Sequence, residues 1–109
     1  MELLTRTIQF PGILDDATIA QFHEQAEGAI HSDATVILVD CTNVQFMSST
    51  GLMALVIAFK RSREFGKPML LRSINEQIKM LLELTGMEQV FEVMENPIEE
   101  SETLLVVSK

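Results

Sequence analysis

Between Thr35 and Lys60 the chain has the sequence TVILVDCTNVQFMSSTGLMALVIAFK. Its first five residues form a short, unbroken run rich in β-branched side chains, which is typical of a central strand covered on both faces. Asp40 ends this strand. After a loop, the sequence predicts a helix over about Ser49 to Phe65, which stops at Gly66. A buried strand followed by a helix is the unit from which parallel sheets are built.

Strands and helices also alternate on the N-terminal side of this segment. A strand is predicted over Leu3 to Phe10, because Pro11-Gly12 cannot continue a ladder of hydrogen bonds. Asp16 is expected to cap a helix from Ala17 to about His31, in which apolar residues recur every three or four positions.

The alternation continues towards the C-terminus. Strands are predicted over Pro68 to Leu71 and Val90 to Met94. Ser73-Ile-Asn-Glu76 is interpreted as a capping box that opens a helix ending at Gly86, and Asn96-Pro-Ile-Glu99 is predicted to start a terminal helix. The whole pattern predicts an α/β fold with a small, mostly parallel sheet of about four strands and about four helices.

The composition is that of one folded domain. The chain has 109 residues, of which 47% are hydrophobic, and its mean hydropathy is +0.21. A chain of this length buries roughly 60–70% of the surface that it exposes when unfolded. No stretch rich in Pro, Gly or Ser marks a linker. We therefore expect residues 1–109 to form a single domain.

Charge and hydropathy argue against several classes of partner and location. Sixteen acidic and eight basic residues give a net charge of −8, which disfavours nucleic acid and anionic membranes, since phosphate contacts need clustered Lys and Arg. The longest apolar run, Gly51 to Phe59, is much shorter than the ~20 residues that cross a bilayer. The N-terminus lacks the pattern of a signal peptide. A cytoplasmic location is therefore expected.

No set of residues predicts an active site. The single cysteine, Cys41, cannot form an intrachain disulfide or build a metal site alone, and the sequence has no Gly-rich phosphate loop. His23 and His31 have no nucleophile near them in sequence and are interpreted as structural residues of their helix. We expect no enzymatic activity, no metal and no cofactor.

The helix predicted after Asp40 has an unusual distribution of side chains. At about 100° per residue its side chains fall on three faces. These are a core stripe (Leu52, Leu55, Phe59), a small-residue face (Gly51, Ala54, Ala58) and a third face (Ser49, Met53, Ile57, Lys60). The third face holds two large apolar groups where a surface helix would be polar. Either the helix is buried nearly all round, or this face is an exposed recognition patch.

Ser48-Ser-Thr-Gly51 lies where the chain enters this helix. Ser and Thr oxygens accept hydrogen bonds from the first free N–H groups of a helix, so a structural cap is one interpretation. The other adds phosphorylation. A phosphate here would meet the positive end of the helix dipole and be tolerated by the fold, whereas a docking partner would meet a new, strongly solvated charge.

Three segments carry a family resemblance. Residues 40–52 are DCTNVQFMSSTGL, Gly12-Ile-Leu-Asp15 forms a turn before the first predicted helix, and Leu84-Thr-Gly-Met87 is followed by Val90-Phe91. In this order they resemble the signature of STAS domains, the anti-sigma factor antagonists. That signature runs strand, Asp, loop, Phe-Ile/Met-Asp-Ser-Ser/Thr-Gly-Leu, helix. Its Gly-x-Leu-Asp turn comes before this core and its Leu-x-x-x-Gly-Leu…Phe segment after it.

The resemblance implies a binding module that switches partners, and not an enzyme. In the family, the unphosphorylated antagonist binds an anti-sigma factor or related serine protein kinase and frees the regulator that the kinase held. The kinase uses ATP to phosphorylate the antagonist, and a metal-dependent serine phosphatase reverses this. The phosphoacceptor maps onto Ser49, with Ser48 and Thr50 as alternatives. The expected partner surface comprises Asp15, Met47, Ser48, Ser49, Thr50, Gly51, Met53 and Ile57.

The sequence departs from the family in two places. The Asp that precedes the phosphoacceptor is Ser48 here, which removes one charge from the docking site and makes Ser48 a rival acceptor. Only eleven residues precede Gly12, where the family fits a two-strand hairpin, so one strand is expected there. The first departure leaves open an alternative function, a STAS adaptor or ligand-binding module without a phosphorylation switch.

A response-regulator receiver is a further alternative from another class. Asp40 ends an apolar strand, Asp15 and Asp16 are paired, and Lys67 precedes a proline. In a receiver, however, the acidic pair directly follows the first strand and the lysine lies near the end of a later one. Here a Pro-Gly turn separates the acidic pair from the first strand and Lys67 comes before a strand, so this alternative is disfavoured.

Overall fold

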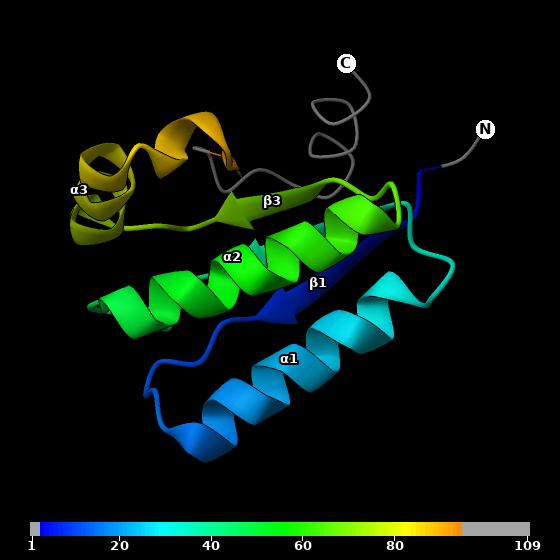
Figure 1. The fold of residues 1–109 in the computed structure, drawn as a ribbon, viewed down its shortest axis with the longest axis horizontal. Coiled ribbons are helices and arrows are strands. Elements are labelled where there is room, and N and C mark those ends of the chain that lie inside the picture. The colour runs from blue at the N-terminus through cyan, green and yellow to red at the C-terminus, as the bar shows by residue number, and fades with distance from the viewer. Residues whose placement is uncertain (1–2, 95–109) are drawn as a thin grey trace.

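The computed structural model describes residues 3–94 and shows strands alternating with helices (Figure 1). The elements are β1 (Thr5–Gln9), α1 (Asp16–Ile30), β2 (Val36–Asp40), α2 (Ser49–Glu64), β3 (Met69–Arg72), α3 (Glu76–Thr85) and β4 (Glu92–Met94), with a 3₁₀ turn (Met87–Gln89) before β4. The expected single strand before Pro11 is confirmed as β1. The terminal helix predicted from Asn96 lies outside the described residues.

The four strands form one parallel sheet in the order β1-β2-β3-β4. The register pairs Ile8 with Val39, Val39 with Leu71, and Leu71 with Val93. Each helix therefore connects two neighbouring parallel strands. The predicted α/β fold is confirmed, and residues 3–94 contain three α-helices, which correspond to the first three of the about four predicted, and a 3₁₀ turn.

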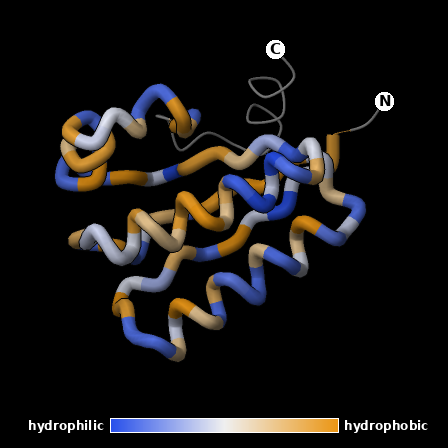
Figure 2. Tube along the Cα trace, viewed as in Figure 1, coloured by the Kyte–Doolittle hydropathy of each residue, from blue (hydrophilic) through white to orange (hydrophobic). Residues whose placement is uncertain are grey.

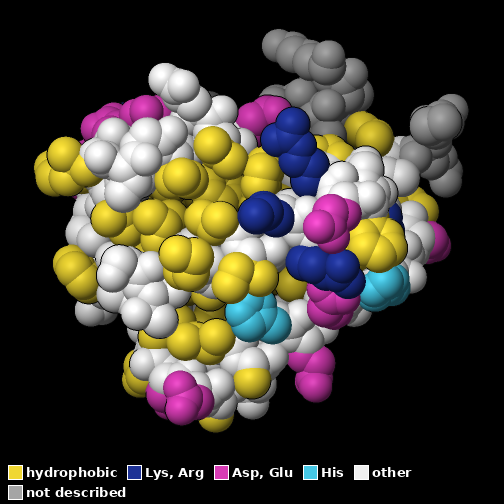
Figure 3. Space-filling view, viewed as in Figure 1, with side chains coloured by type: hydrophobic (Ala, Val, Ile, Leu, Met, Phe, Trp, Pro, Cys, Tyr) yellow, Lys and Arg dark blue, Asp and Glu magenta, His cyan; other side chains and the backbone are white. Residues whose placement is uncertain are grey.

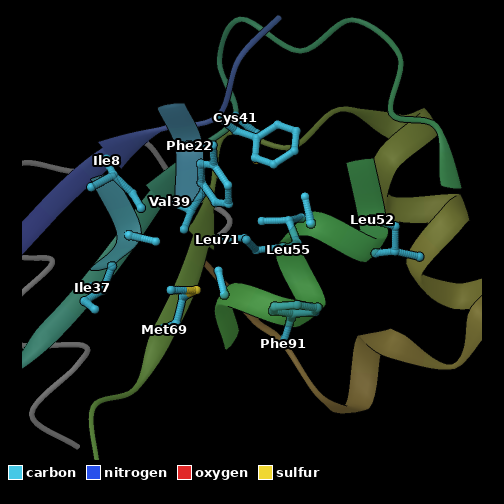
Figure 4. Close-up of a cluster of buried hydrophobic side chains, with 14 of the residues drawn as sticks. Ile8, Phe22, Ile37, Val39, Cys41, Leu52, Leu55, Met69, Leu71 and Phe91 are labelled. Carbon is cyan, nitrogen blue, oxygen red and sulfur yellow. The ribbon is translucent and has the colours of Figure 1, made fainter. Parts of the chain in front are cut away.

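The main core lies between the sheet and the helices. In Figure 4, Phe22 of α1 and Leu55 of α2 lie close to the strand residues Val39 and Leu71. Leu55, Val39 and Leu71 have no exposed surface. A smaller cluster (Val36, Leu38, Leu70 and Met94) is buried on the opposite face of the sheet. All five residues of β2 are buried, as expected of a central strand.

The surface of α1 follows the expected amphipathic pattern, with hydrophilic and hydrophobic residues alternating along the helix (Figure 2). Its buried side is made by Phe22, Ala26, Ala29 and Ile30. The cap differs from the prediction. Asp15, and not Asp16, is the N-cap: its Oδ1 accepts the Thr18 N–H at 2.8 Å, while the Thr18 hydroxyl accepts the Asp15 N–H at 2.9 Å. This reciprocal pair starts the helix one residue earlier than expected.

The N-cap of α3 also differs from the predicted one. The predicted capping box of Ser73 and Glu76 does not form, because Ser73 has a left-handed backbone (φ 60°) two residues ahead of the cap. Asn75 is the N-cap instead, and its side-chain oxygen accepts the Ile78 N–H at 2.9 Å. β4 is shorter than predicted, since the 3₁₀ turn occupies the residues before it.

Asp40, at the end of β2, is a buried carboxylate with several partners. Its Oδ1 accepts the backbone N–H of Thr42 at 3.1 Å and the Thr42 hydroxyl at 2.6 Å, and its Oδ2 accepts the Gln9 amide at 3.0 Å. Arg72 lies 3.8 Å from Oδ2. Burial by itself raises the pKa of Asp40, but these hydrogen bonds and the arginine outweigh it and hold the pKa below its usual range. The carboxylate therefore ties β1, β2 and β3 together.

We predict that Asp40→Asn lowers the free energy of unfolding by about 1–3 kcal/mol at pH 7, because the amide presents N–H groups to the Gln9 and Arg72 donors. In the wild type the folded pKa lies below the unfolded one. The stabilisation of the fold by the Asp40 carboxylate is therefore present above about pH 4 and is lost as the pH falls through the pKa of Asp40 in the folded state. Urea unfolding from pH 7 to pH 2 measures both effects. Equal acid sensitivity of wild type and variant would contradict this role.

Candidate functional site

Two loops meet at the edge of the sheet where the strands end. A Cβ atom on Gly12 would lie 2.5 Å from the backbone oxygen of Asn43, and one on Gly51 would lie 2.7 Å from Cδ1 of Leu14. The loop after β1 is thus packed directly against both the loop after β2 and the first turn of α2. Leu14 precedes the α1 cap, so this contact also places Asp15 next to the start of α2.

Helix α3 fixes the loop after β2 from the other side. The side chain of Gln77 accepts the Met47 N–H at 2.7 Å and donates to the Met47 carbonyl at 3.0 Å. Asn75 donates to the carbonyls of Val44 and Gln45 at 3.1 and 2.9 Å. The backbone just before α2 is therefore held in one position. The roles of Asn75 and Gln77 could not be predicted from sequence, because their hydrogen-bond partners lie about 30 positions earlier in the chain.

Ser48 and Ser49 have different environments. Ser48 is the N-cap of α2, partly buried, and its hydroxyl oxygen accepts the Gly51 N–H at 3.2 Å. Ser49 is the first residue of the helix and is exposed, and its side chain makes no hydrogen bond to residues 3–94. The capping role therefore belongs to Ser48, which leaves the Ser49 hydroxyl available to a modifying enzyme.

A groove runs between α1 and α2 beside Ser49. It has a volume of about 430 Å³ and is lined by Ile19, His23, Ser49, Thr50, Met53, Ala54 and Ile57. Met53 is 58% exposed and Ile57 is 46% exposed. Figure 3 shows hydrophobic side chains gathered across this side of the molecule. The explanation that the helix is buried nearly all round is therefore wrong, because this face of α2 is exposed.

The sequence placed eight residues on the partner surface, and the structure divides them. Asp15, Ser49, Thr50, Met53 and Ile57 are exposed, and Ser48 is partly exposed. Met47 and Gly51 are buried, which corrects their assignment as contact residues. Met47 fills the core beneath the turn, and Gly51 gives room to Leu14. Both shape the surface without forming part of it.

An ion pair joins the two helices further along the same groove. The Arg61 guanidinium donates two hydrogen bonds to the Glu27 carboxylate, at 2.8 and 2.9 Å. These bonds are the main cause that lowers the pKa of Glu27 to about 2. His31 lies 3.2 Å from Glu27 and packs edge-on against Phe65. His31 thus has the structural role expected of it.

A response-regulator receiver finds no support in the described part of the chain. Lys67 donates to the carbonyls of Ile30 and Ser32 at the end of α1, whereas Asp40 has Arg72 beside it, so the lysine of a receiver is not in place. Burial, together with the charge of Asp40, raises the pKa of the Cys41 thiol to about 12. No three His, Cys, Asp or Glu side chains among residues 3–94 are grouped to hold a metal ion. Within the same residues, every helix is too short or too polar to cross a membrane.

Sequence comparison relates this chain to one family of proteins. The family model described as STAS domain matches residues 4–103. The "Anti-sigma-B factor antagonist" of Listeria monocytogenes is 30% identical over 82 residues, which cover 75% of this chain and 72% of that protein.

Solved structures of STAS proteins share the fold. An anti-sigma-factor antagonist (STAS) domain protein from Planctomyces limnophilus has a TM-score of 0.75 at 22% identity, covering 94% of this chain and 90% of that one. The anti-sigma factor antagonist SpoIIAA, in its unphosphorylated form, has a TM-score of 0.73 at 18% identity, covering 98% and 90%.

The different roles of the two serines lead to a stability prediction. Ser48→Ala should lower the free energy of unfolding by about 1 kcal/mol, because α2 loses its N-cap side chain and the Gly51 N–H loses its hydrogen-bond acceptor. Ser49→Ala should change it by less than about 0.5 kcal/mol, since an exposed hydroxyl without a partner is removed. Chemical denaturation of the two variants beside the wild type measures this difference. A larger loss for Ser49→Ala would mean that Ser49 is the cap.

Proposed function

The chain belongs to the STAS domain family, and from this we propose that it is an anti-sigma factor antagonist that acts by partner switching. Unphosphorylated, it binds an anti-sigma factor that is also a serine protein kinase. Phosphorylation of Ser49 releases it, and a metal-dependent serine phosphatase restores binding. The chain performs no catalysis itself, needs no cofactor and acts in the cytoplasm.

The observation that carries this proposal is the position of Ser49. Its exposed side chain borders an apolar groove at the first turn of α2. A partner that places an apolar side chain between Met53 and Ile57 would cover Ser49 at the same time. The binding surface and the modified residue are then one site, so a change at Ser49 acts directly on the partner.

The charge added by phosphorylation has opposite effects on fold and binding. The kinase transfers the terminal phosphoryl group of ATP: a bond forms from the Ser49 oxygen to phosphorus, the bond to ADP breaks, and the serine proton leaves. The phosphate carries about −1.5 to −2 charges at pH 7, which the N-terminus of α2 stabilises. A partner must remove water from this charge to cover the groove. Binding is lost while the fold persists.

The family supports this type of function. Its members compared above are regulators named as antagonists of anti-sigma factors. The antagonist named in Listeria is similar over most of this chain. These relatives support a regulatory protein. The assignment of the switch to Ser49 rests on the family signature, and the exposed position of Ser49 on α2 agrees with it.

One observation favours a second candidate, an adaptor without a switch. Ser48 stands where the family signature has Asp, and its hydroxyl oxygen accepts a hydrogen bond from the Gly51 N–H. The docking site of a kinase is then less acidic than in the family. If no kinase recognises this turn, the groove would bind a partner constitutively.

A binding experiment separates the two candidates. Immobilised wild type, Ser49→Ala and Ser49→Glu are exposed to lysate of the native organism from which ATP has been removed, so that the wild type stays unphosphorylated. We expect wild type and Ser49→Ala to retain a serine kinase, and Ser49→Glu to lose it because of its charge. All three should melt at similar temperatures. Recovery of the same partner by all three would contradict the switch and favour the adaptor.

Met53 gives an independent test of the groove. Met53→Asp should weaken partner binding by about tenfold or more, because it puts a charge at the centre of the apolar surface. Its free energy of unfolding should change by less than about 0.5 kcal/mol, since the side chain is exposed. Titration calorimetry with the recovered partner measures the affinity.

Met80→Asp is the matched control for this variant. Met80 is also a helical methionine, 59% exposed against 58% for Met53, but it lies on α3 and does not line the groove. It should bind the partner like the wild type. Equal losses for the two variants would show that the groove is not the docking surface.

A further inference from the structure

The side chain of His23 borders the groove between α1 and α2. His23 belongs to α1 and Ser49 to α2, and both residues line the same hollow. Among the described residues that line it, His23 is the only one with a titratable side chain. Its ring packs against its neighbour Phe22, with the ring centres 5.9 Å apart. It makes no hydrogen bond or ion pair to any part of residues 3–94.

The charges around His23 belong to other contacts or point elsewhere. One turn further along α1, Glu27 is bound by Arg61 of α2. Asp16 and Glu24 are exposed on α1. Asp16 lies two helical turns before His23, and Glu24 points about 100° round the helix axis from His23. From α2, the groove presents Met53, Ala54 and Ile57, which carry no charge. An imidazolium at His23 therefore has no built-in counter-ion in the groove.

We infer that His23 receives the phosphate of a phosphorylated Ser49, so that the modification fills the groove as well as charging it. The inference rests on the proposed function, since it requires phosphorylation of Ser49. A protonated imidazole donates an N–H to a phosphate oxygen, and such charge-assisted hydrogen bonds are about twice as strong as neutral ones.

This contact would make the switch sensitive to pH. Phosphate and imidazolium stabilise each other, so each shifts the protonation of the other by the same free energy. Below the titration midpoint of the imidazole the phosphate is held in the groove and competes with the partner's apolar side chain. Above that midpoint His23 is neutral and the hold weakens.

The test uses the full chain with phosphoserine incorporated at position 49 during translation, so no kinase is needed. The titration of His23 is followed by proton NMR of its ring from pH 5 to pH 9. The chain has two histidines, and His31 at the far end of α1 is the internal control. We expect phosphorylation to move the titration midpoint of His23 up by about half a unit or more, while His31 moves by less than half as much.

Phosphorus NMR of the same sample gives the reciprocal readout. The second ionisation of the phosphate should occur at lower pH in the wild type than in His23→Gln. This difference should equal the rise in the titration midpoint of His23 that phosphorylation causes. Equal movement of both histidines, or no difference between wild type and His23→Gln, would overturn the contact. Either result leaves the binding experiments on Ser49 unaffected. Failure of those experiments would likewise leave this titration interpretable.

Discussion

The close packing of two loops at the edge of the sheet determines where α2 begins. Gly12 lies against the backbone of Asn43, and Gly51 lies against Leu14. A side chain at Gly12 would meet the backbone of Asn43 and force the two loops apart, whereas one at Gly51 would displace only the end of the Leu14 side chain. Asn75 and Gln77 fix the same turn from α3. The first turn of α2 is thus held by three elements while its outer side faces solvent.

Within this turn, neighbouring residues divide structure and function between them. Ser48 and Gly51 face inwards and complete the helix start, whereas Ser49 and Thr50 face outwards. Met53 and Ile57 continue the outward side along α2 and form the groove with α1. A charge placed at Ser49 therefore changes the surface without removing a contact that the fold needs.

Most of the fold could be predicted from the sequence, because hydrophobic spacing and β-branched runs report burial directly. The buried strand from Val36 to Asp40 is indicated in this way. Helical spacing also identifies the apolar third face of α2, but it leaves open whether that face is buried or exposed. The errors lie where local geometry depends on distant contacts. Ser73 could have capped α3 by its sequence, but its left-handed backbone moved the cap to Asn75.

The candidate site was predictable in its centre and less so at its rim. The family signature led to Ser49, and helical spacing led to Met53 and Ile57. Met47 lies beside them in sequence but is buried, because the loop turns inwards before the helix. His23 could not be assigned to the site from sequence. Its place in the groove depends on how α1 packs against α2, about 26 positions further along the chain.

The central claim is that Ser49, and not Ser48, is the residue modified by the partner kinase. Mass spectrometry of the wild-type chain after incubation with native lysate and ATP locates the phosphate directly. The account predicts phosphate on Ser49, with Ser48 unmodified because its hydroxyl caps α2. Phosphate on Ser48, or none on the segment from Ser48 to Thr50 while a kinase is bound, would contradict it.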